Sequence, residues 1–237
     1  MKRLLRGILG FALAYVLIGA LLDRVIFPEA EPGPDYYPRQ GQVFVSRTEG
    51  FRQTVLKREG GLAWVELVLE PRAPGPPEHI HTSFAENFIV AEGTLSLLVN
   101  GEKKLLRAGE SLLVTPGTPH KPFNETDSPV VIRGPLTPEY GMPERFTVFL
   151  TQAYGFFDES ESNGRPPKAV LQMSRFSPEY DSWLAGPPVP LQKAVYFIIG
   201  PTARLLGYRT QYEKYVPNRE FKSEVPRPNN GMRQTAS

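Results

Sequence analysis

Cysteine is absent from this chain of 237 residues, and charges of the two signs nearly balance. Without cysteine the protein has neither disulfide bonds nor thiolate metal ligands, so any metal must be held by histidine, carboxylate or carbonyl groups. The net charge of +2 creates no strong field for a polyanion, and no basic stripe with interleaved aromatic residues is present. We therefore expect no nucleic-acid partner.

Charge is also missing from one long run near the N-terminus, Gly7–Leu22. As a helix this run spans roughly 24 Å, slightly less than a hydrocarbon core of about 30 Å, and Arg6 and Arg24 can reach the headgroups from its ends. Basic residues precede the run, which favours a cytoplasmic N-terminus. We expect a single-pass transmembrane anchor over residues 1–27, with the remaining chain outside the cytoplasm, in a periplasm or extracellular.

Two other interpretations of this run stay open. A cleaved signal peptide needs small residues flanking the cleavage position after the apolar run. Ala12-Leu13-Ala14 lies inside the run, and Pro28-Glu29-Ala30 matches poorly. A buried core helix is the second interpretation, although a run that is apolar on all sides at an extreme terminus is rarely core.

Proline is abundant and falls mostly between short apolar runs, which favours strands and turns over a helical bundle. Residues 28–40 are rich in proline and charge and predict an extended linker. Residues 41–138 then alternate between β-like runs and turn signals, of which Asn100-Gly101 is the strongest hairpin signal. The expected strands are Gln42–Arg47, Thr54–Lys57, Ala63–Leu69, Phe88–Ala91, Thr94–Val99, Lys104–Arg107, Ser111–Thr115 and Val130–Arg133.

Helical spacing replaces the β pattern over residues 139–215. Apolar residues from Phe146 to Ala153 predict an amphipathic helix that begins near Pro143 and stops at Gly155. The same spacing recurs from Leu191, before a break at Gly200-Pro201, after which Ala203–Leu206 can continue the helix for another turn. This second helix would cap the open end of the barrel, lie on the membrane surface or form a lid. Residues 216–237 are polar and predict a disordered tail.

The three histidines of the chain, His79, His81 and His120, all lie in the β region. His79 and His81 are two residues apart, so on an extended strand their side chains point to one face. Glu86 would lie on the opposite face of a continuous strand, so we expect a turn after His81 and a new strand near Glu86. His120 belongs to a later strand that can lie alongside. Three imidazoles and one carboxylate suit one divalent Fe, Mn, Ni, Cu or Zn ion.

The spacing of these residues resembles the two sequence motifs of the cupin family. The first motif has its positions at His79, His81, Glu86 and Gly93, with a leading glycine, Gly75, that is less exact. The second motif has its positions at Gly109, Gly117, His120 and Asn124. Its proline is displaced by one residue to Pro116, which affects a turn and not a ligand. The resemblance covers about residues 62–135, roughly a third of the chain.

The resemblance implies a jelly-roll barrel, the cupin double-stranded β-helix, with a metal near its middle. It implies His79, His81, Glu86 and His120 as the ligands. The expected fold class is thus an all-β core with an N-terminal transmembrane helix and C-terminal helices. Asn124 is expected to be structural.

Four polar residues near the motifs are expected to have no catalytic role. Glu78 alternates away from the metal and is expected at the surface. Thr82, Ser83 and Thr115 are expected to be turn residues, because no histidine is free to activate them.

Two classes of function fit these expectations. The first is a metal-dependent oxidoreductase, dioxygenase-like, acting on a small organic molecule. The second is a non-catalytic module that binds or senses a small ligand with a structural metal, favoured by the anchor and by the lack of a second titratable group near the motifs. A sugar isomerase ranks lower because it needs a base. The expected partners are a small-molecule ligand or substrate and the membrane; a homodimer is left open.

Overall fold

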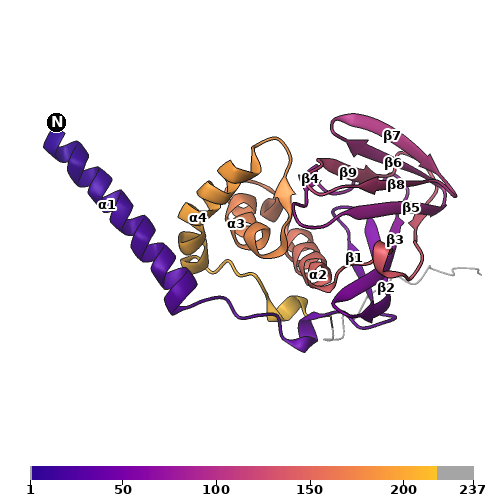
Figure 1. Cartoon of the computed structure of the whole chain (residues 1–237), viewed down its shortest axis with the longest axis horizontal. Helices are drawn as coiled ribbons and strands as arrows, with labels where there is room; N and C mark the ends of the chain where they lie inside the picture. The colour runs from indigo at the N-terminus through magenta and orange to yellow at the C-terminus, as the bar shows by residue number, and fades with distance from the viewer. Residues whose placement is uncertain (1, 218–237) are drawn as a thin grey trace, which may run out of the picture.

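A computed structural model describes residues 2–217 of the chain. Figure 1 shows an N-terminal helix that projects from the body, a group of helices in the middle and the β-strands on the far side. The strands form two antiparallel sheets, ordered β1-β2-β3-β10-β5-β8 and β12-β4-β9-β6-β7, with β11 paired to β3. Two such sheets around one apolar core are the architecture that the sequence predicts.

Each of the expected runs coincides with a strand, although β2 is longer than expected and β11 and β12 lie in the region expected to be helical. Their bounds are β1 Val43–Ser46, β2 Phe51–Glu59, β3 Leu62–Leu69, β4 His79–Ile80, β5 Glu86–Glu92, β6 Thr94–Val99, β7 Glu102–Arg107, β8 Ser111–Val114, β9 His120–Phe123, β10 Val130–Ile132, β11 Met142–Pro143 and β12 Trp183–Leu184. Asn100 and Gly101 form the tight turn between β6 and β7, and both have positive φ, at 52° and 77°. These dihedrals are those of a type I′ hairpin turn, so the hairpin prediction is confirmed.

Alternation along β2 decides which of its residues face the core. Phe51, Gln53 and Val55 are buried, while Arg52 between them is exposed. Val55 packs with Leu69, Val90, Leu95 and other apolar residues of both sheets. Gln53 is therefore a polar residue on the apolar face of a strand, in the interior of the barrel.

Gly75 lies where two chain segments almost touch. Its φ is +67°, and a Cβ at this position would collide with the backbone carbonyl oxygen of Pro122 in β9. Only glycine fits both the left-handed backbone and this close approach. Gly75, the leading glycine of the first motif, thus lets the segment before His79 lie against the strand of His120.

Three α-helices follow the barrel: α2 Glu144–Glu159, α3 Lys168–Tyr180 and α4 Val189–Leu205. Single 3-10 turns occur at Pro34–Tyr36, Pro138–Tyr140, Glu161–Gly164 and Glu213–Tyr215. α2 packs against β1 and β3, whereas α4 packs on α3 and on the end of the N-terminal helix. The helix for which a cap, a membrane-surface helix and a lid were the alternatives thus meets the barrel mainly at β12, through Tyr196 on Trp183, and α2 covers more of the barrel.

The sequence misplaced two helix ends and missed one helix. α2 continues through Gly155 because this glycine gives room for the Tyr215 ring rather than ending the helix. α4 continues through Pro201, which packs against Gly19 of the N-terminal helix. α3 was not expected, because much of its buried face is polar, with Gln172, Ser174, Arg175 and Ser177 among the buried residues.

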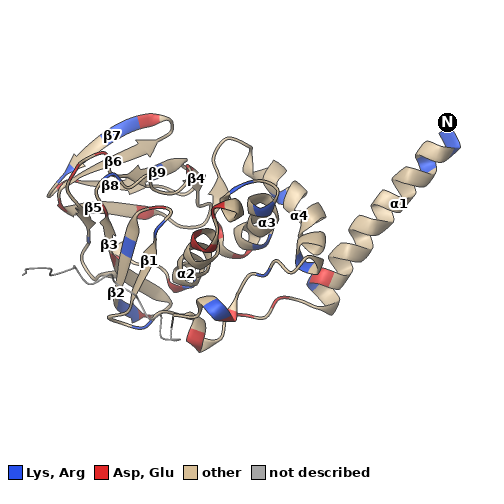
Figure 2. Cartoon of the chain, turned by 180° about the vertical axis from the view of Figure 1, so that it is seen from behind, with Lys and Arg blue, Asp and Glu red and all other residues tan. Residues whose placement is uncertain are grey.

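The N-terminal helix α1 covers Lys2–Leu21 and continues as a π-helical turn, Leu22–Ile26. Within residues 2–217, this is the one helix long and apolar enough to cross a membrane, and none of its most apolar window is buried. Figure 2 shows charged residues only near its two ends. At the inner end, Asp23 is buried and pairs with Arg175 at 2.9 Å and with Arg204 at 3.0 Å.

The expected linker and tail are described only in part. Tyr36 and Tyr37 of the linker pack against the aromatic core between the helices. Residues 216 and 217 of the expected tail are described, and Val216 is buried. The remainder of that prediction, residues 218–237, lies outside the described residues.

Candidate metal centre

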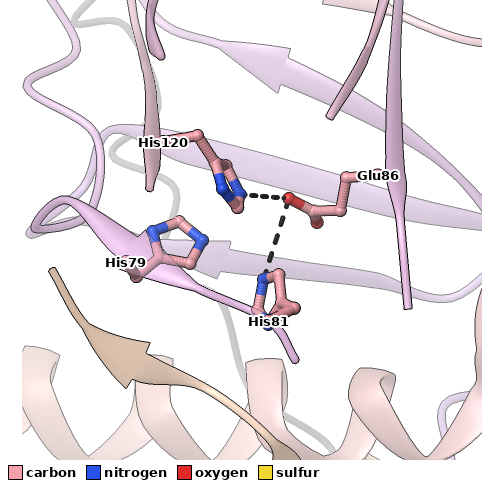
Figure 3. A group of neighbouring side chains, drawn as sticks. All are labelled: His79, His81, Glu86 and His120. Atoms are coloured by element: carbon pink, nitrogen blue, oxygen red, sulfur yellow. Dashed lines mark hydrogen bonds and ion pairs between the residues drawn. The ribbon is translucent and has the colours of Figure 1, made fainter. Parts of the chain in front are cut away.

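The four predicted residues come together at one place inside the barrel (Figure 3). His79 begins β4 and pairs in register with His120, which begins β9. His81 follows β4 directly, the chain turns as expected, and Glu86 begins β5. One ligand atom from each residue lies within 4.8 Å of the others. Loop and strand geometry thus gathers the three imidazoles and the carboxylate predicted from spacing.

Glu86 lies between two of the imidazoles. Its Oε2 is 2.8 Å from Nε2 of His120 and 3.8 Å from Nε2 of His81. The rings of His79 and His120 have centroids 4.3 Å apart. His81 and His120 are almost fully buried, while His79 and Glu86 are partly exposed. The cluster is therefore closed on one side and accessible on the other.

Each imidazole is held by a backbone carbonyl on its other nitrogen. The Nδ1 atoms of His79, His81 and His120 donate to the carbonyl oxygens of Pro77, Asp181 and Thr118 at 3.0, 2.8 and 2.9 Å. With Nδ1 protonated, a neutral imidazole presents the lone pair of Nε2. All three Nε2 atoms can then act as metal ligands at the same point.

His81 provides a specific test of whether a metal ion fits. Its Nε2 is buried, and no hydrogen-bond partner reaches it from the described residues. Leaving a buried acceptor unpaired costs about 1–3 kcal/mol, and a coordinated cation would remove that cost. Three imidazoles and a carboxylate also match the preferences of divalent transition metals. The residues present fit a metal ion.

Electrostatics divides the cluster into neutral and charged groups. Burial, together with the charges of His81 and His120, lowers the pKa of His79 to about 3. Burial also lowers the pKa of His81. Burial opposes ionisation of Glu86, but the hydrogen bond from His120 and the nearby imidazoles outweigh it and lower its pKa to about 2. Burial lowers the pKa of His120, but the hydrogen bond to Glu86 and the charge of Glu86 outweigh burial and raise it. Glu86 is thus an anion that accepts a hydrogen bond from His120 and lies beside the neutral imidazoles of His79 and His81.

Asp181, at the end of α3, holds the turn between His81 and Glu86. Its carboxylate accepts hydrogen bonds from the backbone N–H and hydroxyl groups of Thr82 and Ser83, all at 2.6–2.7 Å. Its backbone, with φ of 53°, lies in the left-handed region and directs the carbonyl to His81. Thr82 and Ser83 are turn residues as expected, but nothing in the motifs pointed to Asp181.

Three comparisons with known proteins bear on the family. A family model described as a cupin domain matches residues 65–135. A curated relative named probable oxidoreductase virH, from Hypocrea virens, is 31% identical over 156 residues, which are 60% of this chain and 68% of the relative.

The chain belongs to the cupin family.

Solved cupin structures resemble this cupin more distantly. A sugar phosphate isomerase of the superfamily from Silicibacter pomeroyi has 23% identity and a TM-score of 0.34, over 44% of this chain and 72% of that one. A cupin-2 domain containing protein from Shewanella frigidimarina has 26% identity and a TM-score of 0.30, over 35% of this chain and 78% of that one.

Asn124 of the second cupin motif has the structural role expected for it. Its Nδ2 donates to the carbonyls of Glu70 and Ser128 at 2.9 and 2.8 Å, and its Oδ1 accepts from Thr126. Glu78 is partly buried rather than fully exposed, and lies outside the four-residue cluster.

The cluster of this cupin opens into a cavity of about 750 Å³ between the barrel and the helices. His79 and Glu86 contribute to its wall, while most of the remaining surface is apolar. The ring of Phe84 stacks on that of His81, with the ring centroids 4.3 Å apart. The ring of Phe146, in α2, meets the His81 ring edge-on, with the centroids 4.8 Å apart. A cavity of this size has room for a small organic molecule.

A second titratable group faces this cavity, contrary to the sequence-based expectation. Glu49, in the loop between β1 and β2, lines it together with Gln53 and Tyr154. Burial and the charge of Asp158 raise the pKa of Glu49 to about 8, although a hydrogen bond with Tyr154 lowers it in part. The expectation failed because Glu49 lies outside both motifs, and folding of α2 over the barrel brings it in. Gln53 could have been noticed, since it interrupts the apolar face of an alternating strand.

Proposed function

We propose that His79, His81, Glu86 and His120 hold one divalent transition metal, and that this cupin uses it in an oxidoreductase reaction on a small organic molecule. The observation that carries this proposal is the convergence of three Nε2 atoms and one carboxylate, each imidazole oriented by a backbone carbonyl, at the wall of an apolar cavity. Orientation by a second hydrogen bond is the usual arrangement of metal-binding histidine.

A dioxygenase-like reaction fits the composition of the site. The metal would supply Lewis acidity and a template for substrate and O2. Both oxygen atoms would enter the organic substrate, so the reaction needs no external reductant. The name of the probable oxidoreductase from Hypocrea virens supports an oxidoreductase reaction, without specifying dioxygenation. Apolar walls favour an organic substrate with little charge.

Other residues of the site would border the substrate, exclude water and orient His81. His79 and Glu86 face the cavity and so border the bound substrate. Phe84 and Phe146 cover His81 and exclude water from that side of the cluster. Asp181 keeps Nδ1 of His81 as the donor nitrogen, which leaves Nε2 for the metal.

Elemental analysis of the purified full-length chain tests the metal proposal. We expect about one transition-metal ion per chain in the wild type and in Glu78→Gln, and loss of the metal in Glu86→Gln and His81→Ala. Glu78→Gln is the matched control, because Glu78 lies outside the cluster. Unchanged metal content in Glu86→Gln and His81→Ala would overturn the assignment.

Oxygen uptake tests the reaction. The iron-loaded protein should consume O2 in the presence of a suitable small organic molecule, whereas a site that holds only Zn and is inert toward O2 would count against the reaction. Thermal stabilisation by small molecules without any turnover would instead identify a binding or sensing module.

We further propose that α1 anchors the protein in a membrane, with the N-terminus in the cytoplasm and the cupin barrel outside. The lack of native cysteine makes this testable with single cysteines. A thiol reagent that cannot cross the membrane spanned by α1 is added to cells in which any outer membrane is permeabilised. It should modify Glu102→Cys on the barrel in intact cells, but Arg3→Cys only after lysis. The reverse pattern would contradict the orientation.

A further inference from the structure

Three polar residues, Glu49, Gln53 and Tyr154, gather at the cavity between the barrel and α2, outside the four-residue cluster. Gln53 of β2 is only 4% exposed, and its Nε2 donates to the Tyr154 hydroxyl at 2.7 Å. That hydroxyl in turn hydrogen-bonds with the carboxyl group of Glu49. All three residues line the same cavity as His79 and Glu86. They form one connected chain of donors and acceptors within an apolar environment.

One hydrogen-bond acceptor among these three side chains has no partner. The Oε1 atom of Gln53 is buried, and no donor from residues 2–217 reaches it. A buried acceptor without a hydrogen bond costs free energy, which a ligand with a matching donor would recover. Since Gln53 lines the cavity, the donor can come from a molecule bound there.

The surroundings restrict the rest of such a molecule. Phe51, Val65, Leu67 and Phe88 contribute apolar surface to the cavity around this polar group. Glu49 is mainly protonated at neutral pH, since its pKa is raised to about 8. A neutral polar group within apolar walls favours an uncharged group of the ligand at this position, whereas Lys121, Arg133 and Glu139 also line the cavity.

We propose that Glu49, Gln53 and Tyr154 bind a hydroxyl group of an otherwise apolar, uncharged substrate. Gln53 accepts a hydrogen bond from that hydroxyl, and Glu49 and Tyr154 hold the Gln53 amide in place. The inference deepens the proposed function and rests on it in one respect, that the cavity beside the metal cluster is the substrate site. It adds a substrate class: hydroxylated aromatic or aliphatic molecules.

A pair of probes that differ in one donor tests this proposal. Binding of 2-naphthol and of its O-methyl ether, 2-methoxynaphthalene, is measured on the full-length chain in detergent micelles. We expect the wild type to bind the naphthol at least about tenfold more tightly, as one satisfied buried acceptor implies. The partition of each probe into protein-free micelles is measured and corrected for in the comparison of the two probes, and it cancels when protein variants are compared in the same micelles.

Gln53→Leu should reduce this preference to within about twofold, because the unpaired acceptor is gone. Gln152→Leu is the matched control: Gln152 is also buried, on α2, but does not line the cavity, and the preference should be retained. Equal affinity of the wild type for the two probes, or no measurable binding of either, would overturn the proposal without any variant. Retention of the preference in folded Gln53→Leu would overturn it as well.

Metal analysis on the same samples separates this inference from the proposed function. Gln53→Leu should keep the metal content of the wild type, because Gln53 lies outside the cluster. A chain without metal that still prefers the naphthol would refute the metal proposal and support the hydroxyl site. A chain that holds metal but binds the two probes equally would support the metal proposal and refute the hydroxyl site.

Discussion

Asp181 shows, at the scale of a single residue, how the helical region supports the metal cluster. One carboxylate fixes the turn that separates His81 from Glu86, and the carbonyl of the same residue fixes the His81 ring. We expect Asp181→Ala to weaken metal binding by about 10–100-fold while all four ligands remain, because residues that orient ligands have effects of this size. Titration with a chromogenic chelator measures the change.

Asp158 offers a matched control for this prediction. Its carboxylate likewise accepts backbone N–H groups of a turn, from Arg47 and Thr48 at 2.6 and 2.7 Å, but it is not among the residues of the cluster. Asp158→Ala should lower stability and leave metal affinity near that of the wild type. Equal effects of the two substitutions on metal affinity would show that Asp181 has only a general structural role.

Glu49 should leave a signature in the pH dependence of stability. Its pKa is about 8 in the folded protein against an ordinary value of 4.5, so the folded state holds its proton more tightly. The resulting stabilisation is complete below pH 4.5 and is lost as the pH rises toward 8, with a slope of at most about 1.4 kcal/mol per pH unit. Glu49→Gln cannot titrate and should lack this contribution.

Denaturant unfolding of the two proteins at several pH values measures the difference. The stability of the wild type relative to Glu49→Gln should decrease steadily between pH 5 and pH 8. Titration of the histidines affects both proteins alike and cancels in the comparison. A difference that stays constant over this range would contradict the raised pKa.

At the scale of elements, the segment that ends in β4 is fixed against β9 by one close contact. Gly75→Ala would place a methyl group against the carbonyl oxygen of Pro122 and would displace the strand that carries His120. We expect a loss of roughly 3 kcal/mol or more in the free energy of unfolding, measured by denaturant titration. Metal affinity should fall as well, because β4 and β9 carry ligands.

Gly109→Ala separates the steric effect from backbone strain. Gly109 also has a positive φ, of +87°, but a Cβ there meets nothing within 4 Å. This variant should lose only about 1–2 kcal/mol, the cost of a left-handed alanine, and should keep its metal affinity. If the two alanine variants are equally stable, the contact with Pro122 is unimportant.

The sequence predicts an element correctly where neighbouring residues in the chain determine it, and fails where tertiary contacts do. Alternation and turn residues such as Asn100-Gly101 fix the strands, and the spacing around His79 predicts the four-residue cluster. Gly155 and Pro201 were misread because contacts with Tyr215 and Gly19 decide their roles. Asp181 and Glu49 could not be predicted, since only tertiary packing brings Asp181 to His81 and Glu49 to the cavity.

At the scale of the whole molecule, ion pairs connect α1 to the helical region at the end of the candidate membrane span. Asp23 is buried between Arg175 and Arg204, and Arg175 also pairs with Glu29. Removing one partner of a buried ion pair is costly, so the inner end of α1 is held in a defined position. The membrane surface would then lie close to α4, beside which α1 leaves the body (Figure 1).

The exposed apolar face of α4 suits this position. Leu191, Val195 and Ile198 are exposed along the helix, and Leu205 and Leu206 at its end are 86% and 63% exposed. Arg209, which is exposed, follows them in the chain, where an anionic headgroup would meet a basic side chain. Among the alternatives for this helix, the interfacial one follows most directly from its packing on α1.

Single cysteines on a chain that otherwise has none can measure whether α4 touches lipid. In the full-length protein reconstituted in bilayers, a fluorescent label on Leu205→Cys or Leu191→Cys should be quenched by brominated lipid, because a helix in the interface buries its apolar side chains among acyl groups. Leu113→Cys is the matched control, since Leu113 is a similarly exposed leucine, 55%, on barrel strand β8. It should stay unquenched. Equal fluorescence of all three with and without brominated lipid would place α4 away from the bilayer.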